Sequence, residues 1–294
     1  MAEVRLFFAT DIHGSDLCWK KFVNAAKYLR CDVLVMGGDM TGKMLVPIID
    51  RGRAGFWTRF GGSERVVDRD EVAALQVDPD AVDRLFRAKM TETLERWLEI
   101  AEERLAGTSV VCLLGPANDD PLFIDEVLAR GGRVQNPEGK VVELPLGWSM
   151  ISVGWSNPTP WDSPRELPED ALEARIDAEA AKLSDTRKAI FNLHVPPKDS
   201  RLDTAALLNP DLSPVMRQGM PVLAGVGSTA VRNVIRHRQP ALALHGHIHE
   251  SRGEAKIGRT ICLNPGSEYS DGVLRAVIVT LSERAVKGYQ FMSG

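Results

Sequence analysis

The segment Leu6-Phe-Phe-Ala-Thr-Asp-Ile-His13 puts two side chains that can bind a metal directly after a short apolar run. Further along the chain, four more apolar runs lead into polar residues of the same kind. The five runs are 6–9, 32–36, 110–114, 189–193 and 241–244. Short, mostly apolar runs of this length are typical of strands buried on both faces. The pattern therefore predicts an α/β protein built on such strands.

The polar residues that follow these runs are expected to lie close together in space. They are Asp11 and His13, Asp39, Asn118 and Asp119, His194, and His247 and His249. Open α/β sheets bind ligands outside the carboxyl ends of their strands, so residues placed there converge. Each motif alone has an ordinary explanation as a turn or a helix cap, but the ordered set favours one functional site.

The donor types at this predicted site indicate a metal centre. They are carboxylates, imidazoles and one amide, with no neighbouring pair of cysteines. Imidazole with carboxylate suits Mn, Fe, Zn, Co or Ni, whereas calcium prefers oxygen donors alone. The candidates outnumber the ligands of one tetrahedral ion, so we expect two divalent ions about 3.5 to 4 Å apart that share Asp39. Manganese is the favoured metal.

The order of the motifs resembles that of the calcineurin-like metallophosphoesterase superfamily. The motifs are D-x-H, GD, N-x-D, H and GHxH, and they run from Asp11 to His249. The resemblance covers most of the chain and implies a single α/β domain over 1–294. This domain would be a four-layer αββα sandwich of two mixed β-sheets flanked by helices. The Asn-Pro-Gly-Ser segment 264–267 also resembles the turn after the family's last ligand strand.

The resemblance further implies which residues share each metal ion. One ion would be held by Asp11, His13 and His249, and the other by Asn118, His194 and His247, with Asp39 between them. The implied activity is hydrolysis of a phosphoester by a hydroxide that bridges the two metals and attacks phosphorus in line. A phosphodiesterase is the favoured version. The alternatives are a phosphomonoesterase of the same fold and a non-catalytic scaffold for protein interactions.

One position departs from the family pattern. The family usually has G-N-H-D, whereas this chain reads Gly115-Pro-Ala-Asn118-Asp119, which places Asp119 where the histidine would fall. A histidine can protonate a leaving oxygen, but an ordinary aspartate is ionised at neutral pH and cannot. Its charge would also repel a dianionic monoester more than a monoanionic diester, which favours diesters. Alternatively, Asp119 faces solvent or braces the following turn.

Two neighbouring residues have other expected roles. His245 is a candidate for the missing acid, with the alternative that it orients a metal ligand from outside the site. Asp120 is expected to cap a helix that has Pro121 at its first position.

Two segments are longer than the connections that the fold requires, at about 43–76 and 155–185. The first contains aromatic and basic residues over 45–62, which predict a hairpin that forms a lid or a partner surface. A helix is expected after it, over 78–107. The second begins with a loop over 155–167, rich in tryptophan and proline, that either holds a base or sugar or simply connects two elements. Lys43, Arg51, Arg53 and Lys198 are candidate phosphate-binding residues.

Composition limits the class of protein. The net charge is −4 and the pI is near 5.9, so a basic nucleic-acid-binding face is not expected. The sequence contains no long apolar segment, its start is not expected to be a signal sequence, and its four cysteines are well separated and expected to be buried and reduced. These features favour a cytoplasmic enzyme without a membrane partner. Its expected substrate is a small phosphoester, and nucleotide-like phosphoesters belong to this class.

Overall fold

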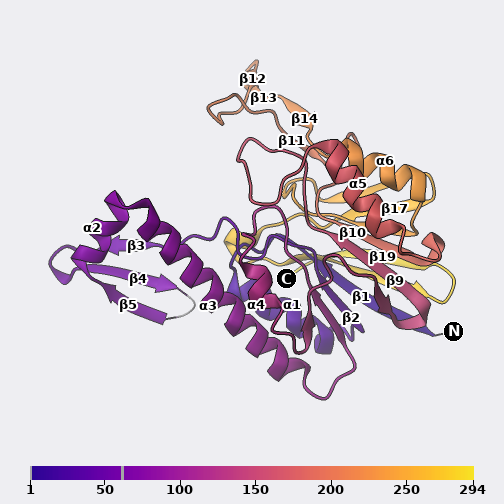
Figure 1. Cartoon of the computed structure of the whole chain (residues 1–294), viewed down its shortest axis with the longest axis horizontal. Coiled ribbons are helices and arrows are strands. Elements are labelled where there is room, and N and C mark those ends of the chain that lie inside the picture. Colours follow the sequence, from indigo (N-terminus) through magenta and orange to yellow (C-terminus); the bar gives the residue numbers. More distant parts are fainter. Residues whose placement is uncertain (1, 61–62) are drawn as a thin grey trace.

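The computed structural model describes residues 2–60 and 63–294 and contains two six-stranded sheets (Figure 1). The first sheet has the strand order β19-β18-β1-β2-β6-β7. Its strands are β1 (Glu3–Ala9), β2 (Val33–Met36), β6 (Val111–Leu114), β7 (Val134–Gln135), β18 (Arg275–Ser282) and β19 (Val286–Ser293). Strands β1, β2, β6 and β7 are parallel, and β18 and β19 are antiparallel additions at one edge. The sheet is therefore mixed.

The second sheet has the order β16-β17-β15-β10-β9-β8. Its strands are β8 (Val142–Leu144), β9 (Trp148–Val153), β10 (Ala189–Leu193), β15 (Leu242–Leu244), β16 (Gly253–Ile257) and β17 (Thr260–Asn264). The four inner strands are parallel, and β8 and β16 pair antiparallel at the two edges. The five strands predicted from apolar runs are all present, divided between the two sheets.

The sheets pack face to face, and helices cover their outer faces. Alternate residues of β1 point to opposite sides: Leu6 and Phe8 enter the core between the sheets, and Phe7 packs toward the helices. The helices over the first sheet are α1 (Asp16–Tyr28), α3 (Pro79–Leu105) and α4 (Ile124–Leu128), and those over the second are α5 (Glu169–Ala180) and α6 (Thr229–Arg238). Both faces of each inner strand are buried, which is why the strands are apolar throughout. The predicted four-layer sandwich is confirmed.

The segment over 43–76, predicted to be an insertion, forms an extension that projects from one side of the body in Figure 1. It contains β3 (Ile48–Asp50), the 3-10 turn η1 (Gly52–Ala54), β4 (Phe56–Phe60), β5 (Ser63–Val67) and α2 (Arg69–Val77). The prediction of a simple hairpin was incomplete, because β5 adds a third antiparallel strand; residues 61–62 lie outside the described part. The predicted helix over 78–107 is confirmed as α3, which Asp78 caps.

A second projection, not predicted from the sequence, consists of short antiparallel strands near the top of Figure 1. They are β11 (Thr204–Ala206), β12 (Met216–Arg217), β13 (Met220–Pro221) and β14 (Leu223–Gly225). The remaining elements are the 3-10 turns η2 (Pro145–Gly147), η3 (Thr186–Lys188) and η4 (Tyr269–Asp271). The four cysteines are buried and free. Within 2–60 and 63–294, none of the helices combines the length and apolar character needed to cross a membrane.

Candidate metal centre

The seven candidate ligand residues come together at the carboxyl ends of the inner strands. Each lies in the segment after its strand: Asp11 and His13 after β1, Asp39 after β2, Asn118 after β6, His194 after β10, and His247 and His249 after β15. Both sheets contribute, so the site lies where the carboxyl ends of the inner strands of the two sheets meet. All seven are buried except His247 and His249, which are half-buried.

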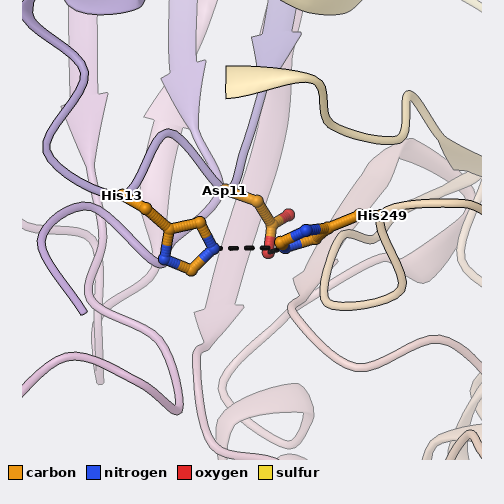
Figure 2. Close-up of side chains that lie close together, drawn as sticks. All are labelled: Asp11, His13 and His249. Atoms are coloured by element: carbon orange, nitrogen blue, oxygen red, sulfur yellow. Dashed lines mark hydrogen bonds and ion pairs between the residues drawn. The ribbon is translucent and has the colours of Figure 1, made fainter. Parts of the chain in front are cut away.

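One group consists of Asp11, His13 and His249, whose side chains point toward one another in Figure 2. Their potential ligand atoms all lie within 4.8 Å of one another. His13 Nε2 is 3.1 Å from His249 Nε2, and His249 Nε2 is 3.3 Å from Asp11 Oδ1. Two imidazole nitrogens and a carboxylate oxygen thus converge on one point.

A second group consists of Asp39, His194 and His247, again within 4.8 Å. His194 Nε2 lies 3.2 Å from Asp39 Oδ2, and His247 Nδ1 donates to Asn118 Oδ1 at 2.8 Å. Asp39 also lies within 4.8 Å of His13, in a third set that includes Asp119. Asp39 therefore faces both groups.

Backbone carbonyls fix the orientation of two of the imidazoles. His13 Nδ1 donates to the Gly42 carbonyl at 2.5 Å, and His194 Nδ1 donates to the Gly37 carbonyl at 3.2 Å. In the neutral ring that binds a metal, with the proton on Nδ1, the Nε2 lone pair of each imidazole would face the centre, as in many metal-binding histidines. His194 Nε2 is buried and has no hydrogen-bond partner of acceptable geometry among the described residues. A cation would satisfy this atom, so the residues present fit a metal ion.

The electrostatics of the cluster also suit a cation. Burial raises the pKa of Asp11, but the charges of His194 and His249 outweigh burial and lower it. Burial lowers the pKa of His194, but Asp39 and Asp11 outweigh burial and raise it to about 9. Burial lowers the pKa of His247 to about 3. The carboxylates therefore hold a positive charge here, and a metal ion can take the place of a proton.

The backbone turns sharply after the strands to direct these side chains. Asp11, His13, Asp39 and His247 have φ values of 55°, 38°, 49° and 66°, in the left-handed region. Such a conformation costs a non-glycine residue about 1 to 3 kcal/mol and is concentrated at functional sites. It is held by hydrogen bonds from Asp11 N to the Gly38 carbonyl at 2.9 Å and from His13 N to the Asp39 carbonyl at 3.0 Å.

The expectation that Asp120 caps a helix is wrong. Helix α4 begins at Ile124, and the Asp120 carboxylate points instead into the loop after β2. It accepts hydrogen bonds from the amides of Met40, Thr41 and Gly42, at 3.0, 2.8 and 3.2 Å. These three backbone amides thus bind the Asp120 carboxylate, which the sequence alone assigns to the start of the next helix. Asp120 orders the loop that carries Asp39.

Asp119 forms an ion pair with Lys43, which the sequence suggests only as a candidate phosphate-binding residue. Its Oδ2 lies 2.6 Å from Lys43 Nζ, and its Oδ1 accepts from Ser163 Oγ at 2.7 Å. Burial raises the pKa of Asp119, but Lys43 and Ser163 outweigh burial and lower it, so the carboxylate is ionised at neutral pH. Burial lowers the pKa of Lys43, and the contact with Asp119 outweighs it and raises the pKa.

His245 lies behind the cluster. Its side chain is completely buried, and Nδ1 donates to the Leu193 carbonyl at 2.7 Å. Burial lowers its pKa to about 4, so the ring is neutral at pH 7. This environment favours the alternative in which His245 supports the strand ends that carry His194 and His247.

Two supporting contacts were not identified from the sequence. The ring of Tyr269 lies 4.6 Å from that of His13, measured between centroids. Ser267 Oγ, in the Asn-Pro-Gly-Ser turn, donates to the Asp11 carbonyl at 2.6 Å. The turn was noticed by resemblance, but Tyr269 stands outside every motif, and only the tertiary structure brings it to the site.

Comparisons with known proteins add evidence on the fold. No family model matches the chain. Over 180 residues, it is 27% identical to the uncharacterized protein MJ1162 of Methanocaldococcus jannaschii, covering 60% of this chain and 71% of that protein. TT1561 of Thermus thermophilus matches with a TM-score of 0.57 and 14% identity, over 100% of this chain and 99% of that one.

Another solved structure matches with a TM-score of 0.63 and 15% identity, over 99% of both chains. At such identities, structural likeness establishes the fold and leaves the activity open. The fold expected from the resemblance to the calcineurin-like metallophosphoesterase superfamily, two mixed sheets between helical layers, is the fold of this chain.

Proposed function

We propose that the chain is a metal-dependent phosphoester hydrolase that prefers phosphodiesters. The observation that carries the proposal is the position of Asp39, which lies within 4.8 Å of ligand atoms in two adjacent groups. One carboxylate that serves both groups is the arrangement needed for a pair of ions. Two such ions, when bound, activate water, orient the phosphoryl oxygens and offset charge in an in-line displacement.

The chain's residues divide between the two ions as the motif order implies. Asp11, His13 and His249 would hold the first, Asn118, His194 and His247 the second, and Asp39 both. This mixture of imidazole, carboxylate and amide donors suits first-row divalent metals, of which manganese is the favoured choice. Two divalent cations against the carboxylates Asp11 and Asp39 leave a net positive centre, which attracts an anionic phosphoester.

The preference for diesters rests on Asp119. Its low pKa keeps a carboxylate beside the centre, where it disfavours the second negative charge of a monoester. Lys43 offsets part of this charge and supplies a cation that can stabilise a leaving oxygen.

The test compares bis(4-nitrophenyl) phosphate with 4-nitrophenyl phosphate as substrates. Metal-stripped protein is assayed with and without added Mn²⁺, alongside His247→Ala and His237→Ala. His237 lies on the exposed end of α6 and is the matched control. We expect Mn-dependent diester hydrolysis that His247→Ala loses and His237→Ala retains. Faster monoester hydrolysis would favour the phosphomonoesterase, and no turnover with any metal would favour the scaffold.

A further inference from the structure

A pocket of about 280 Å³ opens directly beside the candidate metal centre. His247 and His249 form part of its wall, so a molecule in the pocket would touch residues of the centre. Other parts of the wall come from the 155–167 loop and from the residues after β11, with Pro158, Trp161, Leu207 and Leu208. The 155–167 loop and the segment that contains β11 therefore both line this pocket.

The lining of the pocket combines polar and apolar side chains, and Lys43 lies close to one of each kind. Lys43 Nζ lies 2.6 Å from Asp119 Oδ2 and 5.1 Å from the centroid of the Trp161 ring. The rest of the lining includes the two histidines of the candidate centre together with proline, tryptophan and leucine side chains. A ligand that matches the pocket carries an anionic group at one end and an apolar group at the other.

The apolar wall is held in place before any ligand binds. Ser163 Oγ donates to Asp119 Oδ1 at 2.7 Å, which ties the loop to the edge of the centre. Glu166 accepts from Thr159 N and from Ser163 N, each at 3.0 Å, and so closes the loop around Trp161. A preformed wall of this kind loses little conformational entropy when a ligand binds.

Large apolar side chains are left exposed at the pocket. Trp161 is 51% exposed and Leu207 is 43% exposed. Adjacent apolar groups in contact with water are characteristic of binding surfaces, because covering them releases free energy. Trp161 can also stack on a flat ring in addition to burying apolar area.

The size and charge of the pocket limit what can fill it. Its volume lies near the lower bound of about 300 Å³ for pockets that hold drug-sized ligands, which suits one compact group. Among the described residues that line it, Lys43 is the one lysine or arginine, and Glu250 adds a carboxylate. A second phosphate group would need several basic donors, so this lining disfavours a ligand with a second phosphate group in the pocket.

We propose that this pocket is the subsite for an ester group of the substrate, and that the substrate class is a phosphodiester bearing one compact, planar, apolar group such as an aryl ring. The inference rests on the proposed function and adds the substrate class. The phosphate lies at the metal centre, Lys43 contacts its oxygens, and the ring stacks on Trp161 between the proline and leucine side chains.

The test measures, by calorimetry, how the Mn-loaded protein binds methyl phenylphosphonate and methyl methylphosphonate, which are monoanions like a phosphodiester. The two probes differ only in the apolar group. Methyl phenylphosphonate should bind about tenfold more tightly to the original protein, and Trp161→Ala should remove this preference without weakening the binding of methyl methylphosphonate. Trp161→Phe should retain the preference, which excludes a general folding defect. Tyr28→Ala, which removes an exposed aromatic ring on α1 outside the pocket, is the control.

The outcomes separate the subsite from the proposed function. Equal binding of the two probes, or a preference that survives Trp161→Ala, would overturn the subsite while Mn-dependent diester hydrolysis still stood. Absence of hydrolysis with every metal would overturn the proposed function and, with it, the assignment of the pocket to a substrate.

Discussion

Lys43 Nζ lies 2.6 Å from Asp119 Oδ2, so the carboxylate at the position where the family usually has a histidine is paired with a cation from a different loop. The pair stands between the candidate metal centre and the apolar pocket. Asp119 also accepts from Ser163 and from Asn118 Nδ2, the latter at 3.0 Å. Asp119 thus connects a candidate ligand, a cation and the pocket loop.

Removing the Asp119 carboxylate should slow turnover and leave the metals bound. Asp119→Ala frees Lys43 and Ser163, and we expect kcat for a diester to fall about tenfold because the cation is no longer held in place. Metal content measured by mass spectrometry should match that of the original protein. Loss of one ion would show instead that Asp119 is a ligand, as its position within 4.8 Å of His13 and Asp39 would permit.

Removing the cation should have a larger effect on catalysis. Lys43→Ala removes the cation that is paired with Asp119 and so takes a positive charge from the edge of the centre. The value of kcat/KM for the diester should therefore fall about a hundredfold. Lys43→Arg should restore part of the loss. Lys287→Ala, which changes an exposed lysine on β19 outside the pocket, is the control. Unchanged kinetics in Lys43→Ala would exclude a role for this cation.

Asp120→Ala should destabilise the protein, although Asp120 belongs to no predicted ligand set. The substitution leaves the buried amides of Met40, Thr41 and Gly42 without an acceptor. We expect the free energy of unfolding in urea to fall by about 3 kcal/mol. The exposed Asp83 on α3, changed to Ala, is the matched control and should stay within about 0.5 kcal/mol of the original. Equal stability of both variants would contradict the proposed role of Asp120.

Metal binding should tighten with rising pH. The pKa of His194 is raised to about 9 without metal, so its ring stabilises the metal-free fold below about pH 6.5, and this contribution is lost as the pH rises through 9. A metal ion must displace this proton, so Mn²⁺ affinity should increase up to about tenfold between pH 7 and pH 8. Calorimetric titration of the metal-free protein with Mn²⁺, in two buffers of different ionisation enthalpy, measures both the Mn²⁺ affinity and the number of protons released. Binding without proton release would contradict this account.

The sequence predicted the features that depend on local pattern. Strands such as β1 and β10 are apolar on both faces because each lies between a second sheet and helices, and the motif residues follow them directly. Residues whose role depends on distant partners show the limit of such reasoning. Asp120 has an ordinary helix-cap pattern with Pro121, and only the folded chain brings it against the Met40 loop.

The same limit applies to the pocket. Nothing in the sequence around Leu207 and Trp161 indicates that they line one cavity, because short strands such as β11 and β14 lack a strong apolar period. The assignment of 43–76 and 155–185 as insertions in a single domain stays a prediction. The individual roles of the candidate metal ligands also stay predictions.

The most direct test of the account is the number of manganese ions bound per chain in the original protein and in Asp39→Ala, measured together with diester turnover at limiting metal. We predict two ions per chain in the original protein, and loss of metal with loss of turnover in the variant, because Asp39 faces both groups. A single ion in the original protein, or full activity of Asp39→Ala at limiting metal, would contradict a centre of two ions bridged by Asp39.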